Sequence, residues 1–276
     1  MPDSPSLASL ISLVTLPVFS RALIALAAAG AAFPALGTFI LNLELIPARF
    51  AVMHAALLGA ALALLIHADP LFVSMAAAAL TGIGVALVSW KGKVSAGGSL
   101  GLVMTLSLGL AFIIFYKGNI HAIEAFNLFW GNILALQPQD VKLIVIACAL
   151  ILIFLTLAWK EIKIVLYDRE LASLSGVPAK IIYTAIILTI CLGIALAMRV
   201  TGALLVDAVT LLPALAARHS AKTLAGLIIR GSIFGLLMNL GGFTLSLLLD
   251  LPVSPSIIVC GAAVILLTKC FSRKKS

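Results

Sequence analysis

The sequence is 276 residues long, 63% of them hydrophobic and only 10% charged, with a formal net charge of +8. Water-soluble domains are about half apolar and about a quarter charged, and a soluble fold could not bury this much apolar surface. The composition therefore excludes a soluble enzyme and predicts a polytopic protein of the lipid bilayer. The basic excess does not indicate nucleic acid, because most basic residues lie in segments that one topology places on one side of a membrane.

The apolar stretches, taken in chain order, predict up to nine transmembrane helices. One crossing needs about 20 helical residues, and no run alternates polar with apolar residues as a barrel strand would. The expected spans are residues 22–42, 51–67, 71–89, 99–116, 141–159, 181–198, 201–217, 231–249 and 254–268. Residues 7–20 are either an interfacial helix or an extension of the first span. The expected fold is one all-α transmembrane permease domain over residues 1–276, a helical bundle with about 8–9 spans.

The basic residues predict the orientation, because Lys and Arg are enriched in cytoplasmic loops. Thirteen of the eighteen fall in segments that one topology places in the cytoplasm, and three fall outside. The thirteen are Lys91, Lys93, Lys160, Lys163, Arg169, Lys180, Arg218, Lys222, Arg230, Lys269, Arg273, Lys274 and Lys275. Outside are Lys117, Lys142 and Arg199. We expect a multi-pass protein of the inner (plasma) membrane with a cytoplasmic C-terminus. Nine crossings put the N-terminus outside, whereas eight, with an early segment failing to cross, put it inside.

Two stretches are irregular. Residues 117–140 carry an aromatic patch at Phe126, Phe129 and Trp130 and predict a short re-entrant or interfacial helix on the outer side. Residues 201–218 contain Gly202 and Pro213 and predict a broken helix, which at membrane depth usually lines a cavity. Ordinary close packing by small residues is the alternative interpretation.

The chain lacks the motifs of a catalyst. It has no G-x-x-x-x-G-K-[ST] loop for nucleotide, no H-E-x-x-H zinc helix and no G-x-S-x-G elbow. It also has no CxxC motif, and its cysteines form no disulfide framework. We therefore expect a non-catalytic protein that binds no cofactor of its own, and any ATP-driven work must come from a partner.

A short helix is predicted between two spans, within residues 167–180. Asp168 is a good N-cap, Leu171 and Leu174 form a small apolar face, Gly176 can end the helix and Pro178 prevents its continuation. Such a helix can dock into a groove of a soluble protein and transmit a push to the flanking spans. It can equally rest at the lipid headgroups.

Ionisable residues within apolar spans are candidates for a substrate pathway. His54, beside Met53, and Asp207 lie inside spans, and an imidazole and a carboxylate can together ligate a divalent metal or relay protons. Either can instead be hydrogen-bonded to a neighbouring helix in a purely structural role. Solvated, structural roles are expected for the charged and titratable residues near span ends, which are Glu44, His67, Asp69 and His219.

The sequence resembles the integral membrane permeases of metal-type ABC importers, which move zinc, manganese or iron. The resemblance rests on DRELASLSGVP (168–178), TGALLVDAVTLLPALAAR (201–218), LFWGNILALQPQD (128–140) and DLPVSPSIIV (250–259), with a weaker match at MHAALLG (53–59). These segments follow one another in the family's order from about residue 20 to residue 268.

The resemblance implies a permease architecture like that of vitamin-B12 and metal importers. It implies a permease homodimer, a pair of cytoplasmic ATPase subunits and a binding protein that delivers the substrate from outside. The ATPase would grip a coupling helix at about residues 168–178, with contacts from Asp168, Arg169, Glu170, Leu171, Leu174, Gly176 and Pro178.

One position departs from the family pattern, which places an aspartate four residues before the histidine. That position is Phe50 here, and the proline of the family's Pro-Gly pair is Leu58. Either Glu44, Asp207 or Met53 takes the aspartate's place beside His54, or the cargo is a chelated metal or an unrelated solute.

Two other classes compete with an ABC importer. A proton-coupled secondary transporter would use Asp207 and His54 as proton carriers, although we find no internal repeat of the kind such folds often show. A membrane-embedded enzyme lacks a catalytic constellation, which leaves an assembly scaffold as the third class.

Overall fold

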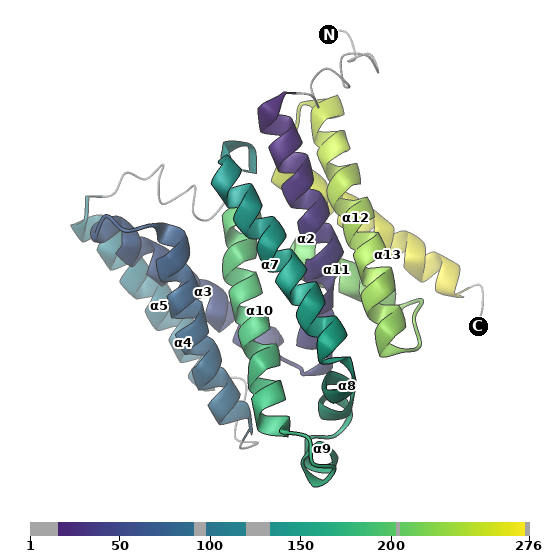
Figure 1. Cartoon of the computed structure of the whole chain (residues 1–276). Helices are drawn as coiled ribbons and strands as arrows, with labels where there is room; N and C mark the ends of the chain where they lie inside the picture. Colours follow the sequence, from purple (N-terminus) through teal and green to yellow (C-terminus); the bar gives the residue numbers. More distant parts are fainter. Residues whose placement is uncertain (1–15, 91–97, 120–132, 203–204, 274–276) are drawn as a thin grey trace. The chain divides into compact units, whose positions relative to one another are not determined.

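The computed structural model describes residues 16–90, 98–119, 133–202 and 205–273. This part of the chain is helical and contains no strand (Figure 1). The helices are α2 (Pro17–Asn42), α3 (Ile46–Leu65), α4 (Pro70–Trp90), α5 (Gly98–Lys117), η1 (Ile133–Ala135), α7 (Pro138–Leu157), α8 (Trp159–Tyr167), α9 (Arg169–Leu174), α10 (Ala179–Thr201), α11 (Val206–Arg218), α12 (Leu224–Leu249) and α13 (Val253–Arg273).

Eight of the described helices are long and apolar enough to cross a membrane, namely α2, α3, α4, α5, α7, α10, α12 and α13. The all-α bundle with about eight spans is therefore confirmed. The expected span 201–217 is wrong as a full-length helix, because α11 has only 13 residues. The helix that is too short to cross a membrane by itself is therefore α11, and not an early segment as the eight-span alternative assumed. At the other end of the chain α2 begins at Pro17, so the last residues of the 7–20 stretch extend the first span.

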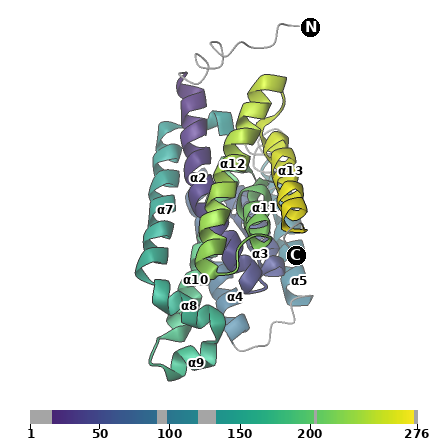
Figure 2. The same ribbon diagram turned by 90° about the vertical axis from the view of Figure 1, so that its right-hand side faces the viewer.

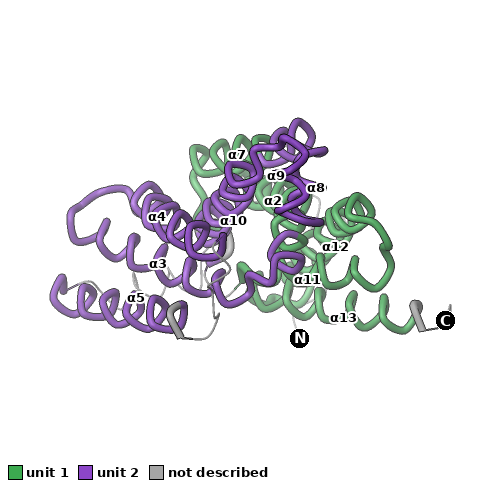
Figure 3. Tube along the Cα trace, turned by 90° about the horizontal axis from the view of Figure 1, so that it is seen from below, with its two compact units in different colours: residues 1–38, 132–150, 205–276 green, residues 39–131, 151–204 purple. Residues whose placement is uncertain are grey.

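The chain forms two compact units, each built from segments far apart in the sequence (Figure 3). Unit 1 comprises residues 1–38, 132–150 and 205–276, and unit 2 comprises residues 39–131 and 151–204. The single permease domain over residues 1–276 stays a prediction.

Unit 1 is held together by close helix packing around α12. A Cβ added to Gly30 of α2 would lie 2.8 Å from the carbonyl oxygen of Gly235, so the two backbones approach as closely as glycine allows. Asn239 of α12, fully buried, donates from Nδ2 to the carbonyl oxygen of Leu26 at 3.0 Å. Small residues and interhelical hydrogen bonds are the usual means of association where lipid removes the hydrophobic drive.

Unit 2 is centred on α3, which packs against α4, α5 and α10. Leu57 and Ala61 of α3 form a buried cluster with Ala111 and Phe115 of α5. At Gly59 a Cβ would lie 2.7 Å from the carbonyl oxygen of Val73, so α3 and α4 are in backbone contact there. Helices α3 and α4 therefore share a tightly packed surface at this point.

The amphipathic helix α8 was not expected as a separate element. Ile162 and Val165 are buried on one side of it, while Lys160 and Lys163 are exposed on the other. In Figure 2, α8 and α9 lie at the end of α10 where that helix begins. The expected outer helix within 117–140 and its aromatic patch, Phe126, Phe129 and Trp130, fall largely outside the described residues.

Candidate functional site

The predicted short helix forms as α9, and Asp168 is its N-cap as expected. The Asp168 carboxylate accepts hydrogen bonds from the backbone N–H groups of Glu170 (2.8 Å) and Leu171 (2.9 Å). These bonds satisfy two of the amides that every helix start leaves without a partner. A second acidic side chain, Glu170, lies in the first turn, where negative charge is favoured by the helix dipole.

The C-terminal end of α9 is closed by backbone geometry that requires glycine. Gly176 has φ +78°, and a residue with a Cβ is strained there. The N–H of Val177 donates to the Ala172 carbonyl at 3.1 Å, and the N–H of Gly176 donates to the Ser173 carbonyl at 3.3 Å. This pair of bonds is a Schellman motif. Pro178 follows as the N-cap residue of α10, so the two helices are joined by a short, rigid corner.

One face of α9 is apolar and exposed, and it is formed by Leu171 and Leu174. Leu174 is 85% exposed and Leu171 48% exposed, whereas Ala172 on the opposite face is fully buried. Tyr167, at the end of α8, is 86% exposed. An exposed cluster of large apolar residues on a capped helix is typical of a docking surface.

Arg169 fastens α9 to two other helices of unit 2. Its Nη1 donates to the carbonyl oxygen of Ser89, near the end of α4, at 3.1 Å. Its guanidinium carbon lies 4.1 Å from the centroid of the Tyr183 ring on α10. The Tyr183 hydroxyl donates to Ser89 Oγ at 2.8 Å, and Trp90 packs its ring against Tyr183 with 5.7 Å between centroids. We call Ser89, Trp90, Arg169 and Tyr183 the arginine knot.

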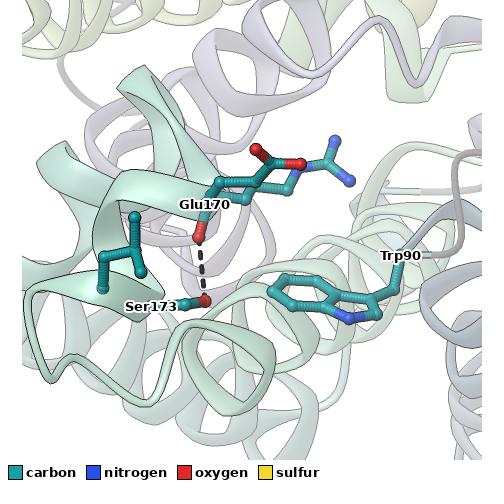
Figure 4. A pocket seen from close by; sticks show the side chains of 5 residues that line it. Trp90, Glu170 and Ser173 are labelled. Atoms are coloured by element: carbon teal, nitrogen blue, oxygen red, sulfur yellow. Dashed lines mark hydrogen bonds between the residues drawn. The ribbon is translucent and has the colours of Figure 1, made fainter.

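A pocket of about 580 Å³ opens beside the knot, lined by Trp90, Arg169, Glu170, Ser173 and Leu174. Figure 4 shows the Trp90 ring on one side of this pocket and Glu170 and Ser173 on the other. Ser173, which also lines the pocket, donates its hydroxyl to the Arg169 carbonyl of the same helix at 2.9 Å. The pocket is thus lined by an aromatic ring (Trp90), a carboxylate (Glu170) and an exposed leucine (Leu174).

Glu44 lies at this same end of unit 2. With Asn42 and Leu43 it lines a second pocket, of about 280 Å³, whose other side includes Asp168 and Arg169. His54 lies further along α3, about 12 Å along the axis from the first residue of that helix. Glu44 and His54 are therefore at different depths, and the pathway role of each stays a prediction.

His54 is half-buried on α3, next to the half-buried Met53. Its Nδ1 lies 2.7 Å from the carbonyl oxygen of Phe50, one turn earlier. Because a carbonyl oxygen only accepts hydrogen bonds, Nδ1 carries the proton and Nε2 of the neutral ring keeps its lone pair. Metal-ligating histidines usually have this arrangement, with the second nitrogen donating to an oxygen.

Asp207 lies in the first turn of α11, directly after the predicted break. The break itself is confirmed at Gly202, where φ is +76° and α10 ends. Pro213, by contrast, lies inside α11 and does not interrupt it, so its predicted contribution to the break is wrong. A proline in a helix removes one hydrogen bond, which a packed helix can tolerate.

The predicted metal candidates His54, Asp207, Met53 and Glu44 stay predictions. Neither unit gathers three or more His, Cys, Asp or Glu side chains that could hold a metal ion, among the residues that are described. Asp207 belongs to unit 1 and His54 to unit 2, so their pairing stays a prediction.

Sequence reasoning found the caps and the apolar face of α9 but missed the arginine knot. Ser89 and Tyr183 are ordinary residues within apolar spans, and no local pattern marks them. Ser89 is 80 positions before Arg169, and a contact over that separation has no signature in one sequence. The sequence offered one signal of a special role for Arg169. It lies directly after the N-cap Asp168, where the helix dipole favours a carboxylate over a cation.

The chain is similar in sequence to membrane proteins of zinc and manganese transport systems. The chain is 26% identical to the high-affinity zinc uptake system membrane protein ZnuB of Haemophilus influenzae over 235 residues, which are 84% of this chain and 89% of the relative. It is 21% identical to the manganese transport system membrane protein MntC of Halalkalibacterium halodurans over 240 residues, 87% of this chain and 82% of that one.

Among solved structures, PsaBC from Streptococcus pneumoniae in complex with Fab has the same fold. The TM-score is 0.84 at 23% identity, and the match covers 98% of this chain and 100% of that chain. A family description, ABC 3 transport family, matches residues 15–272, which is nearly the whole sequence. The chain therefore belongs to the ABC 3 transport family.

Proposed function

We propose that the chain is the membrane-spanning permease of an ABC importer for divalent metal ions, with zinc and manganese as the first candidates. The observation that carries the proposal is α9, a doubly capped helix with Leu171 and Leu174 exposed, in a chain of the ABC 3 transport family. The names of the two relatives, membrane proteins of a zinc uptake system and of a manganese transport system, support the choice of cargo.

The work of transport is supplied by partners. The sequence has no nucleotide-binding loop, so a pair of cytoplasmic ATPase subunits hydrolyses ATP while gripping α9 of a permease homodimer. A binding protein hands over the ion outside. ATP binding shifts the permease between outward-facing and inward-facing states, because the ATPase makes different contacts with the two. The permease itself is non-catalytic, and the metal is cargo rather than a cofactor.

The proposed topology places α9 in the cytoplasm. The end of α4 at Ser89, which is bonded to Arg169, then lies on the same side of the membrane. So does the turn before α3, where Glu44 lines a pocket with Asp168. It follows by alternation that α2 enters from outside and that α5 ends outside. This side also receives the exposed Lys160, Lys163 and Lys180, in agreement with the positive-inside rule.

The C-terminus follows from the same alternation. From α9, α10 leads outwards, so α12 starts in the cytoplasm only if residues 202–218 complete a crossing. Helix α11 by itself covers about 20 Å of a hydrocarbon core of about 30 Å. The basic residues Arg218, Lys222 and Arg230 favour this return, which makes nine crossings with the N-terminus outside and the C-terminus inside.

A chelated metal or another solute is the second candidate cargo. It is favoured by Phe50, which occupies the place of the carboxylate that would complete a bare-ion site with His54. The free Nε2 of His54 can still ligate a metal that arrives with other ligands attached.

The test is uptake by proteoliposomes that contain the permease, its ATPase and its binding protein. We expect radiolabelled zinc or manganese to accumulate when ATP is present on the ATPase side and not when a non-hydrolysable analogue replaces it. Accumulation driven by a pH gradient in the absence of ATP would instead establish the proton-coupled transporter.

A further inference from the structure

Arg169 makes a bond that α9 does not need for its own stability. Both ends of α9 are closed by its own residues, through the Asp168 carboxylate and the Gly176 corner. The Arg169 side chain instead reaches the Ser89 carbonyl, in the last described turn of α4.

The second side of the knot fixes the arginine in one orientation. The Tyr183 ring is fully buried, and the Arg169 guanidinium stacks on it at 4.1 Å. Tyr183 in turn donates to Ser89 Oγ, and Ser89 Oγ donates to the Val85 carbonyl at 2.6 Å. A planar guanidinium that is stacked on a ring and bonded to a carbonyl loses the freedom of a surface arginine. Helices α4, α9 and α10 thus meet at one side chain.

This junction continues to the helix that carries His54. Helix α4 approaches α3 closely at Gly59, where Val73, Ser74 and Ala77 leave no room for a Cβ. Gly59 and His54 are five positions apart on α3. The contacts thus form a continuous path from α9 to α4 through the arginine knot and from α4 to α3 through packed backbone. Along the chain, α9 is joined only to its neighbours α8 and α10.

We propose that Arg169 is a positioning residue that ties α9 to the end of α4, so that the ATPase stroke on α9 moves α4 and α3 together. This inference rests on the proposed importer function and deepens it. Arg169 acts through Ser89 and Tyr183 and does not touch the cargo.

The functional test compares three variants in the reconstituted importer. Arg169→Met removes the charge and the donors while keeping an apolar stem, and Arg169→Lys keeps the charge and one donor. The matched control is Arg230→Met, which removes another arginine that donates to a backbone carbonyl, that of Ser220 in unit 1. The readout is the number of zinc or manganese ions accumulated per ATP hydrolysed, together with the amount of ATPase that co-purifies with the permease.

We expect Arg169→Met to lower the ions carried per ATP by about 2- to 30-fold, the range of couplings that single residues modulate. The resemblance implied an ATPase contact from Arg169, but its guanidinium lies on Ser89 and Tyr183. The co-purified ATPase should therefore not change, because Leu171 and Leu174 are intact. Arg169→Lys should recover part of the loss and Arg230→Met should match the unmodified protein. An unchanged ratio in Arg169→Met, or a loss of the ATPase from the complex, would overturn the proposal.

A distance measurement tests the junction without relying on transport. Spin labels on Ser175→Cys and Leu87→Cys, two exposed positions beside the knot, report the separation of α9 and α4 by pulsed electron resonance in a Cys270→Ser background. We expect the distance between the two labels of one protomer to be narrow in the complex and the same with and without ATP, and to broaden in Arg169→Met. A distribution that Arg169→Met leaves unchanged contradicts the junction. If the unmodified importer instead moves no metal while the narrow distance persists, the proposed function fails and the junction stands.

Discussion

At the scale of single residues, Asp168 determines whether α9 exists as a helix. Its carboxylate accepts two backbone hydrogen bonds, which form the side-chain N-cap of α9. Asp168→Ala should destabilise the first turn by about 1 kcal/mol, the usual cost of losing an N-cap. Asp168→Asn, which keeps a capping oxygen, should behave nearly as the natural residue. Hydrogen exchange at residues 169–174 measures the difference, and equal protection in the two variants would contradict the capping role.

Leu171 carries the predicted docking contact. It is half-exposed on the face of α9 opposite the buried Ala172, so a charged residue there does not disturb the interior of the permease. Leu171→Glu should leave membrane insertion and thermal stability unchanged but abolish stimulation of ATP hydrolysis by the loaded binding protein. Normal stimulation in this variant would rule out α9 as the coupling helix.

Among the proposed pathway residues His54 has the clearest chemical support, because Nδ1, and not Nε2, makes the hydrogen bond to the Phe50 carbonyl. His54→Ala should lower zinc or manganese uptake by at least about tenfold, as expected when a metal contact is lost. The control is His67→Ala, which changes an exposed histidine after α3. Uptake of radiolabelled metal by cells without other importers measures the effect, and equal uptake by the two variants would remove His54 from the pathway.

At the scale of elements, the closeness of α3 and α4 depends on Gly59. A Cβ at this position would lie 2.7–2.9 Å from α4 atoms, including the Val73 carbonyl oxygen, so Gly59→Ala should separate the helices and cost about 1–3 kcal/mol. Gly84→Ala on α4 is the matched control, because nothing lies within 4 Å of its added Cβ. Thermal unfolding in detergent should show a lower midpoint for the first variant only. Equal midpoints would mean that the helix contact tolerates a methyl group.

Local signals account for the elements that the sequence predicted correctly. Asp168, Gly176 and Pro178 each act on the backbone within a few residues, so the bounds of α9 could be read directly from them. The sequence predicted the break at Gly202, but it did not predict that α11 has only 13 residues, because hydropathy alone does not mark where a helix begins within an apolar stretch. The arginine knot depends on three helices meeting, which hydropathy does not encode.

At the scale of the whole molecule, composition and basic residues predicted the membrane fold and a consistent topology. The sequence could not pair His54 with Asp207, since that requires the placement of side chains on α3 and α11. It also could not supply a substitute for the carboxylate missing at Phe50. The number of long helices did not decide the topology either, because the short helix α11 determines whether the chain crosses again.

The importer mechanism depends most on α9 facing the cytoplasm, where an ATPase can reach it. Ser175→Cys, exposed at the end of α9, can be labelled with a membrane-impermeant thiol reagent in a Cys270→Ser background, with Asn119→Cys after α5 as the control for the outer side. We predict that Ser175→Cys reacts only in inside-out vesicles and Asn119→Cys only in right-side-out vesicles. Reaction of Ser175→Cys in sealed right-side-out vesicles would contradict the importer mechanism, because no cytoplasmic motor could touch α9.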